Sequence, residues 1–150
     1  MSVSIPSTQI VGELIESNKQ ALSERVTQKV LPRTTSQSGD ILFKAVLAAI
    51  EAIAVYFLNE DINKYQQFFQ GYTQGLFQQS TDAMVSGFQV VSEGITAEIS
   101  ALVEQSLPGP ENERIRILYY RKIQGLHTLA NVSAINAHIN HRSKKAKNDE

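Results

Sequence analysis

The fold is decided by an apolar stretch at residues 41–58, which reads ILFKAVLAAIEAIAVYFL. Its only charged residues are Lys44 and Glu51. The stretch is long enough to raise the question of a membrane span, but two charges well inside so short a segment are costly in lipid. A helix buried in a protein lets both side chains reach an edge. We therefore predict a central core helix and no membrane span.

The segments on either side of this stretch repeat their apolar residues with a period near 3.6, and none shows the alternation of a long strand. Residues 7–30 begin at Ser7, a good N-cap, and a loop with proline and glycine separates them from the core helix. Residues 62–79 carry an aromatic face, and residues 82–106 an apolar stripe. Pro108, Gly109 and Pro110 end that stripe before a last helix at 111–141.

These segments predict an all-α fold, a compact antiparallel bundle of about five helices with a long C-terminal helix. One helical domain is expected at residues 1–142, followed by a disordered basic tail at 143–150. The last helix would span about 46 Å, more than the others can cover alone. An overhanging amphipathic helix favours a homodimer. We expect its interface on the first and last helices, at Ile15, Leu22, Val26, Tyr119, Ile123 and Leu126.

The composition of the chain excludes several kinds of functional site. The 150 residues carry a net charge of −1 and no cysteine, which excludes disulfides, thiolate metal sites and cysteine nucleophiles. Residues 1–110 hold six Lys/Arg and eleven Asp/Glu, whereas residues 111–150 hold eight and four. The basic end offers an alternative function as a helical interaction or nucleic-acid-binding protein, although its cations form two separate clusters. Solvated helix ends or docking to an acidic protein surface are favoured over nucleic acid.

No conventional active site is visible. The chain lacks a nucleophile elbow, a phosphate-binding loop and the Glu-x-x-His pairs of di-iron bundles, so we predict that it is not an enzyme. His138 and His141 share a helix face, but no Asp or Glu occurs between Glu113 and Asp149, so no metal site is expected. His127 stands among apolar residues. It is a core or boundary histidine, or alternatively the axial ligand of a haem-binding globin-type sensor.

Aromatic residues gather in and around the third predicted helix. Together with small glycine faces, at Gly71 and Gly75 and at Gly87 and Gly94, they are compatible with plain core packing or with a cavity for an apolar ligand. The candidate lining residues are Phe43, Tyr56, Phe57, Phe68, Phe69, Tyr72, Phe77 and Phe88.

Three segments carry a resemblance to a known family. They are the opening helix IVGELIESNKQALSERVTQKVL, the junction NEDINKYQQFFQ and the exit helix RIRILYYRKIQGLHTLANVSAINAHI. The pattern, including Leu14, Asn18, Leu22, Val26 and Val30, resembles the globin-related, usually haem-free sensor domains of RsbR-type stressosome proteins and some bacterial sensor kinases. It departs from them in lacking a tryptophan in the opening helix and in having Gln78-Gln79-Ser80 where an arginine-glycine stretch is common.

That resemblance implies a globin-like, non-enzymatic module of bacterial stress-response signalling. It also implies a fatty-acid-like apolar ligand, no other cofactor, and a signalling kinase or regulator as partner. No catalytic residues carry over from the family. The N-terminus lacks a secretory leader and no lipidation motif is present, so the expected location is the cytoplasm.

Overall fold

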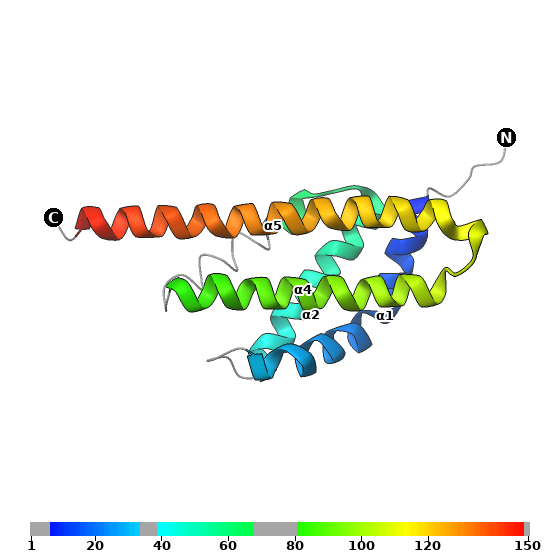
Figure 1. Cartoon of the computed structure of the whole chain (residues 1–150), viewed down its shortest axis with the longest axis horizontal. Coiled ribbons are helices and arrows are strands. Elements are labelled where there is room, and N and C mark those ends of the chain that lie inside the picture. Colours follow the sequence, from blue (N-terminus) through cyan, green and yellow to red (C-terminus); the bar gives the residue numbers. More distant parts are fainter. Residues whose placement is uncertain (1–6, 34–38, 68–80, 149–150) are drawn as a thin grey trace.

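Figure 1 shows the computed structural model of the chain, which describes residues 7–33, 39–67 and 81–148. Side chains are described at 8–32, 39–67 and 89–129 and at Val132. Within these ranges every regular element is helical, and residues 63–67 are helical too, so the predicted all-α fold is confirmed. The elements are α1 (Ser7–Val30), η1 (Leu31–Arg33), α2 (Gly39–Asn59), α4 (Thr81–Ser106), η2 (Pro110–Asn112) and α5 (Glu113–Asn148).

The helix boundaries follow the capping and breaking residues. α1 spans the residues that its apolar stripe predicts, and α2 exceeds the apolar stretch slightly at each end, with Asp40 in its first turn. An acidic residue there complements the helix dipole. Of the third predicted helix, residues 63–67 are helical, and its remaining residues lie outside the described ranges.

The predicted disorder of the basic tail is corrected by the structure. α5 continues through residues 143–148 and ends at Asn148. Lys and Ala are good helix formers, and lysines near the C-terminal end of a helix interact favourably with its dipole. Polarity alone is therefore a poor reason to end a helix at residue 142. At 36 residues, α5 is about 54 Å long.

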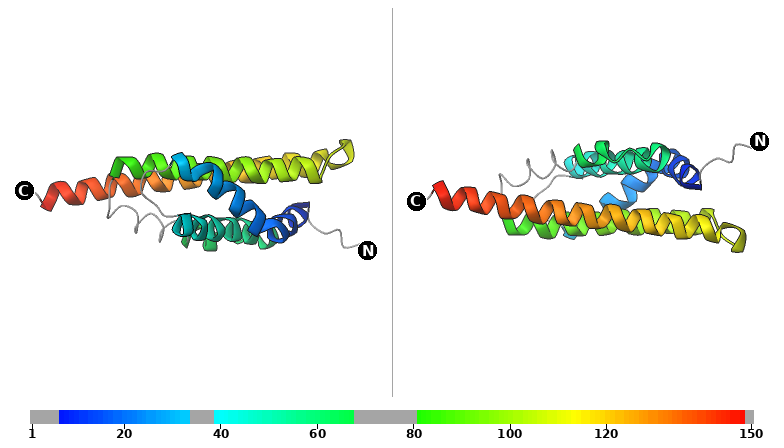
Figure 2. Two further views of the ribbon diagram at one scale, coloured as in Figure 1. Left: turned by 90° about the horizontal axis from the view of Figure 1, so that it is seen from below. Right: turned by 90° about the horizontal axis from the view of Figure 1, so that it is seen from above.

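The helices form two layers. α4 and α5 lie antiparallel as a long hairpin, α2 lies in the other layer, and α1 runs obliquely between the layers (Figures 1 and 2). The first half of α1 packs on α2 and its second half on α4. Three side chains of α1, Asn18, Ser23 and Thr27, donate hydrogen bonds to carbonyls four residues earlier. Such bonds satisfy these half-buried or buried polar groups within their own helix.

The α1–α2 contact is antiparallel and close. A Cβ placed on Gly12 would lie 2.8 Å from the backbone nitrogen of Leu58 and 2.7 Å from its Cγ. Farther along the pair, the Nζ atom of Lys19 lies 3.5 Å from Oε1 of Glu51. Both pairs fit one register of the two helices. The absence of a side chain at Gly12 therefore sets how closely the backbones approach.

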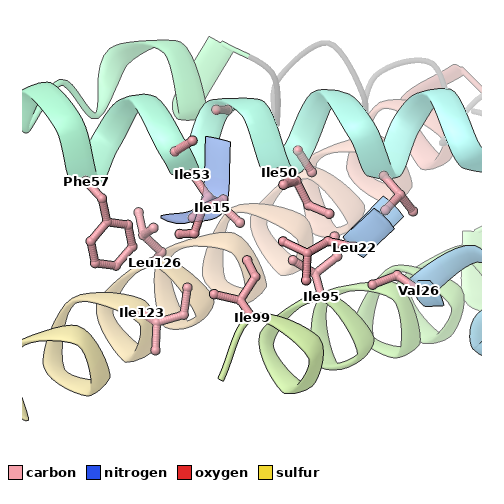
Figure 3. Close-up of a cluster of buried hydrophobic side chains, with 14 of the residues drawn as sticks. Ile15, Leu22, Val26, Ile50, Ile53, Phe57, Ile95, Ile99, Ile123 and Leu126 are labelled. Atoms are coloured by element: carbon pink, nitrogen blue, oxygen red, sulfur yellow. The ribbon is translucent and has the colours of Figure 1, made fainter. Parts of the chain in front are cut away.

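The core lies where α1, α2, α4 and α5 meet. Figure 3 shows Ile15 and Leu22 of α1, Ile50 and Phe57 of α2, Ile95 and Ile99 of α4, and Ile123 and Leu126 of α5 gathered in one cluster. α2 is the described helix that is long and apolar enough to cross a membrane. In this structure eight of its residues are buried. Its predicted place as the core helix is confirmed by their position in the main hydrophobic cluster.

The turn between α4 and α5 fixes where α5 begins. Gly109 has a φ of 88°, a left-handed conformation that favours glycine. The guanidinium of Arg116 donates to the carbonyl oxygens of Leu107 (2.6 Å) and Gly109 (2.8 Å). The side chain of Asn112 donates to the carbonyl of Pro108 at 2.9 Å. The predicted stop at residues 107–110 is thus a hydrogen-bonded turn.

Candidate functional site

A row of polar side chains joins α4 to α5. Ser92 Oγ lies 2.9 Å from Nδ1 of His127, and Ser100 Oγ lies 2.8 Å from the hydroxyl of Tyr119. One turn beyond Ser100, the hydroxyl of Tyr120 donates to Glu104. We call this row the polar seam: Ser92, Ser100 and Glu104 of α4 with Tyr119, Tyr120 and His127 of α5.

Two pairs of the seam fit one register of the two helices. The Ser92–His127 and Ser100–Tyr119 pairs have the same alignment, which places Thr81, the first residue of α4, about level with position 138 of α5. The remaining ten or so residues of α5 extend past α4, as Figure 1 shows. Apolar residues can slide past one another, whereas paired polar groups at a helix interface specify alignment. α5 therefore extends past α4, the helix that it pairs with.

The end of α2 and the segment after it hold α5 from the other side. The rings of Phe57 and Tyr119 are stacked, with centroids 5.8 Å apart and planes at 28°. The Nζ atom of Lys122 lies 2.9 Å from Oε1 of Glu60 and 5.1 Å from the centroid of the Tyr56 ring. These residues and Tyr65, whose hydroxyl lies 3.4 Å from the carbonyl oxygen of Leu126, form the aromatic clasp.

Burial changes the acidity of two tyrosines in these contacts. Desolvation raises the pKa of Tyr65 well above its ordinary value. It also raises the pKa of Tyr119, an effect that the hydrogen bond to Ser100 partly opposes. Both phenols therefore stay neutral throughout the physiological pH range and serve as hydrogen-bonding groups rather than as acids or bases.

One buried carboxylate links α1 to α4. The side chain of Glu98 is only 8% exposed and is flanked by Arg25, 3.3 Å away, and by Lys29. Both cations reach it from solvent, so the charge is compensated without being fully desolvated. A Cβ on nearby Gly94 would meet Val30 at 2.8 Å, so α4 and α1 approach closely here. The contact explains Gly94 as a packing glycine. Gly71, Gly75 and Gly87 lie outside the described side chains.

His127 is half-buried at the α4–α5 interface. Its Nδ1 is engaged by Ser92, and the donor of that bond depends on the imidazole tautomer. Within the described part of the chain, no group of three His, Cys, Asp or Glu residues could hold a metal ion. His138 and His141 lie on α5 beyond the described side chains.

The predicted pocket residues fall into two groups. Phe57 is buried in the core, while Phe43 and Tyr56 are half-buried on α2. Of these three, Tyr56 and Phe57 make an edge-on ring contact at 5.9 Å. The prediction for the others lies outside the described side chains: Phe68, Phe69, Tyr72, Phe77 and Phe88. Whether the aromatic group encloses a cavity stays a prediction.

The six residues predicted for a dimer interface occupy a different position from the one expected. All are buried within a single chain and belong to one core cluster: Ile15, Leu22, Val26, Tyr119, Ile123 and Leu126. They pack against α2 and α4, elements that the apolar stripe alone does not identify as partners. In this conformation their surface is already covered, so a second subunit would have to use other residues. The homodimer itself stays a prediction.

Neither a family model, a curated protein nor a solved structure matches this chain. The resemblance to stressosome sensor domains therefore stays a prediction.

The residues that sequence reasoning missed are those whose role depends on pairing between helices. Glu98, Ser92 and Ser100 lie near the apolar stripe of α4, and polar residues in such a position can indicate a contact with another helix. Gly12 lies among the apolar residues of α1, where a glycine can likewise indicate a close contact between helices. Glu60 carries no such signal, since its left-handed φ of 57° is visible only in the structure.

Proposed function

We propose that the protein is a non-enzymatic regulatory module that acts through the position of α5. A signal would change how α5 packs on α4, and the overhanging end would present that change to a partner protein. The polar seam is the observation that carries this proposal. It gives α5 one preferred register, and its hydroxyl, carboxylate and imidazole groups can be satisfied by water if α5 moves.

The proposed signal is a small apolar ligand of fatty-acid type, held between α2 and the aromatic residues predicted to line a pocket. The aromatic clasp supports this choice, because it connects the end of α2 to Tyr119 and Lys122 of α5. A ligand beside Tyr56 and Phe57 would therefore act directly on the clasp. The fold that we propose is that of globin-like bacterial sensor domains. The partner that we propose is a signalling kinase or regulator.

Distance measurements between spin labels test this function. The native chain has no cysteine, so two introduced cysteines carry the only labels. Exposed Ser106 of α4 and Thr128 of α5 are separated by about 22 Å along the hairpin, at 1.5 Å per residue. Exposed Gln28 of α1 and Asn59 of α2 provide a control pair that does not involve α5.

Palmitate and oleate are the probes, added to the full chain. The proposal predicts a second Ser106–Thr128 distance, displaced by about one helical turn of 5.4 Å, with no change in the control pair. Native mass spectrometry of the same samples reports binding. Binding without any change in the α5 distance would contradict the α5 mechanism. Absence of binding to either fatty acid would contradict the ligand class.

A haem sensor is the second candidate, and the Ser92–His127 contact is the observation that favours it. An imidazole that ligates iron usually has its other nitrogen hydrogen-bonded, and here Nδ1 is engaged while Nε2 would be the ligand. Haem added to the purified chain should then give a Soret band that His127→Ala abolishes. A spectrum equal to that of free haem would reject this candidate.

A further inference from the structure

The four cations in the first part of α5 differ in what they contact. Arg116 holds the α4–α5 turn, and Lys122 is part of the aromatic clasp. Arg114 and Arg121 are exposed, and neither forms an ion pair with a carboxylate among the described residues. They are seven residues apart, so they lie on one face of α5 about two turns from each other.

Apolar surface lies on the same face. Ile117 is 45% exposed and Val132 is 49% exposed. A Cβ added to Gly125, between them, would meet nothing within 4 Å. The buried residues Tyr119, Ile123 and Leu126 lie on the opposite side of the helix. We call the exposed side the outer α5 face: Arg114, Ile117, Arg121, Gly125, Thr128 and Val132.

Contacts within the described part of the chain give no reason for this face. A glycine inside a helix costs about 1 kcal/mol relative to alanine, and close packing against the described residues does not explain Gly125. A small residue on an exposed face lets a second helix approach closely. Apolar residues exposed on both sides of that position would be covered by such a helix.

Charge indicates the kind of helix. The one carboxylate of α5 is Glu113 in its first turn, which forms no ion pair with Arg114 or Arg121, and residues 114–148 contain no aspartate or glutamate. A partner would have to supply the carboxylates. Nucleic acid fits less well, because phosphates would not cover Ile117 and Val132. A lipid surface also fits less well, because Arg121 and Thr128 lie between these two residues at the centre of the face.

We propose that the outer α5 face binds an acidic amphipathic helix of a partner protein. Two carboxylates of that helix, about two turns apart, would pair with Arg114 and Arg121, and its apolar residues would cover Ile117 and Val132. Gly125 lies at the closest approach of the two backbones. This inference rests on the proposed function and adds to it the chemistry of the partner.

Fluorescence anisotropy with the full chain tests the assignment. The probe is a synthetic amphipathic helix of about four heptads with leucine at its core positions and glutamate beside them. A second peptide replaces every glutamate with lysine. Single-stranded DNA and vesicles of phosphatidylcholine with phosphatidylglycerol are the other probes. All are measured at near-physiological salt, because salt at that concentration screens nonspecific attraction between exposed charges.

The acidic peptide should bind, and the lysine peptide should not. Arg121→Glu and Arg114→Glu should each weaken binding by about tenfold, since each replaces an ion pair with a like-charge contact. Gly125→Leu should weaken it similarly by blocking close approach. Lys64→Glu is the matched control, because it makes the same charge change at an exposed lysine outside α5. It should change binding by less than about twofold.

Three results would overturn the proposal. The acidic peptide could fail to bind, Lys64→Glu could weaken binding as much as Arg121→Glu, or DNA or vesicles could bind more tightly than the peptide. Circular dichroism of each variant confirms that it is folded. None of these outcomes changes the spin-label distance between Ser106 and Thr128. A failure of the proposed partner class can therefore be distinguished from a failure of the proposed movement of α5.

Discussion

The α1–α2 and α4–α5 contacts are both antiparallel helix pairs, but different chemistry holds them. α2 and α1 meet closely at Gly12 and Leu58 and contribute apolar residues to the core, with the Lys19–Glu51 ion pair at the edge of their contact. α5 and α4 also contribute apolar residues to the core, but they are joined in addition by the hydroxyl, carboxylate and imidazole groups of the polar seam. Tight apolar packing tolerates little displacement. Polar pairs specify one alignment, yet water can replace them when that alignment changes.

In the function that we propose, the two pairs have separate tasks. The α1–α2 pair would be the fixed part of the molecule, and the α4–α5 pair would be the adjustable part. The aromatic clasp connects them, because Phe57 of α2 stacks on Tyr119 of α5. Substitutions in each part should therefore differ in whether they change stability alone or the position of α5 as well.

The largest effect is expected from Phe57→Ala, which removes a fully buried ring that touches both parts. Loss of the ring and the cavity left behind should lower the free energy of unfolding by about 3–5 kcal/mol. Urea denaturation followed by circular dichroism measures this change. Ile117→Ala, at an exposed position, should cost less than about 0.5 kcal/mol. A loss below about 1 kcal/mol for Phe57→Ala would show that the clasp is not part of the core.

Gly12→Ala tests the fixed pair. The added methyl group would overlap the backbone of Leu58, so the helices must separate and the free energy of unfolding should fall by about 1–3 kcal/mol. Gly125→Ala has open space around it and should gain up to about 1 kcal/mol from helix propensity. Thermal denaturation of both variants gives the comparison. Equal shifts in the same direction would contradict the close approach at Gly12.

Alkaline pH should weaken the fold through the buried tyrosines. Above pH of about 10 the unfolded chain loses its phenol protons, whereas the raised pKa values of Tyr65 and Tyr119 keep theirs in the folded state. The unfolded state then binds fewer protons, so the free energy of unfolding falls as pH rises, by about 1.4 kcal/mol per pH unit for each tyrosine. Below that pH these groups cause no change.

Urea denaturation between pH 8 and pH 11 measures this dependence. Tyr65→Phe should remove about half of the contribution that the two buried tyrosines, Tyr65 and Tyr119, together make to the slope above pH of about 10. An unchanged slope in that variant would contradict the burial of Tyr65.

The seam should show a smaller coupling energy. Ser100→Ala and Tyr119→Phe each remove one partner of the same hydrogen bond, and each should cost about 1 kcal/mol. The double variant should lose less than the sum, with a coupling of about 0.5–1.5 kcal/mol in a double-mutant cycle. Strict additivity would mean that the two hydroxyls do not interact in solution.

Much of the secondary structure could be predicted from the sequence because the signals are local. Ser7 and the turn at Pro108 and Gly109 mark helix ends by their own backbone preferences. The sequence does not predict the end of α5 correctly, because the lysine-rich residues suggest a solvated tail although lysine is also a good helix former.

Pairing between helices was less predictable. An apolar stripe shows that Leu22 and Tyr119 are buried but not against which element, so the sequence predicts a dimer interface for residues that lie in the core. Polar residues such as Glu98 and Ser100 gain a role only when a second helix is placed beside them. For the same reason the aromatic residues predict a pocket whose shape depends on packing that a single helix does not encode.

In the mechanism that we propose, the polar seam sets the register of α5 on α4. Spin labels at Ser106 and Thr128 in the Ser92→Ala, Ser100→Ala double variant test it most directly. We predict a second distance, displaced by about 5 Å, that is absent from the protein with an intact seam, while the Gln28–Asn59 control distance stays single. One unchanged Ser106–Thr128 distance in a folded double variant would contradict the claim.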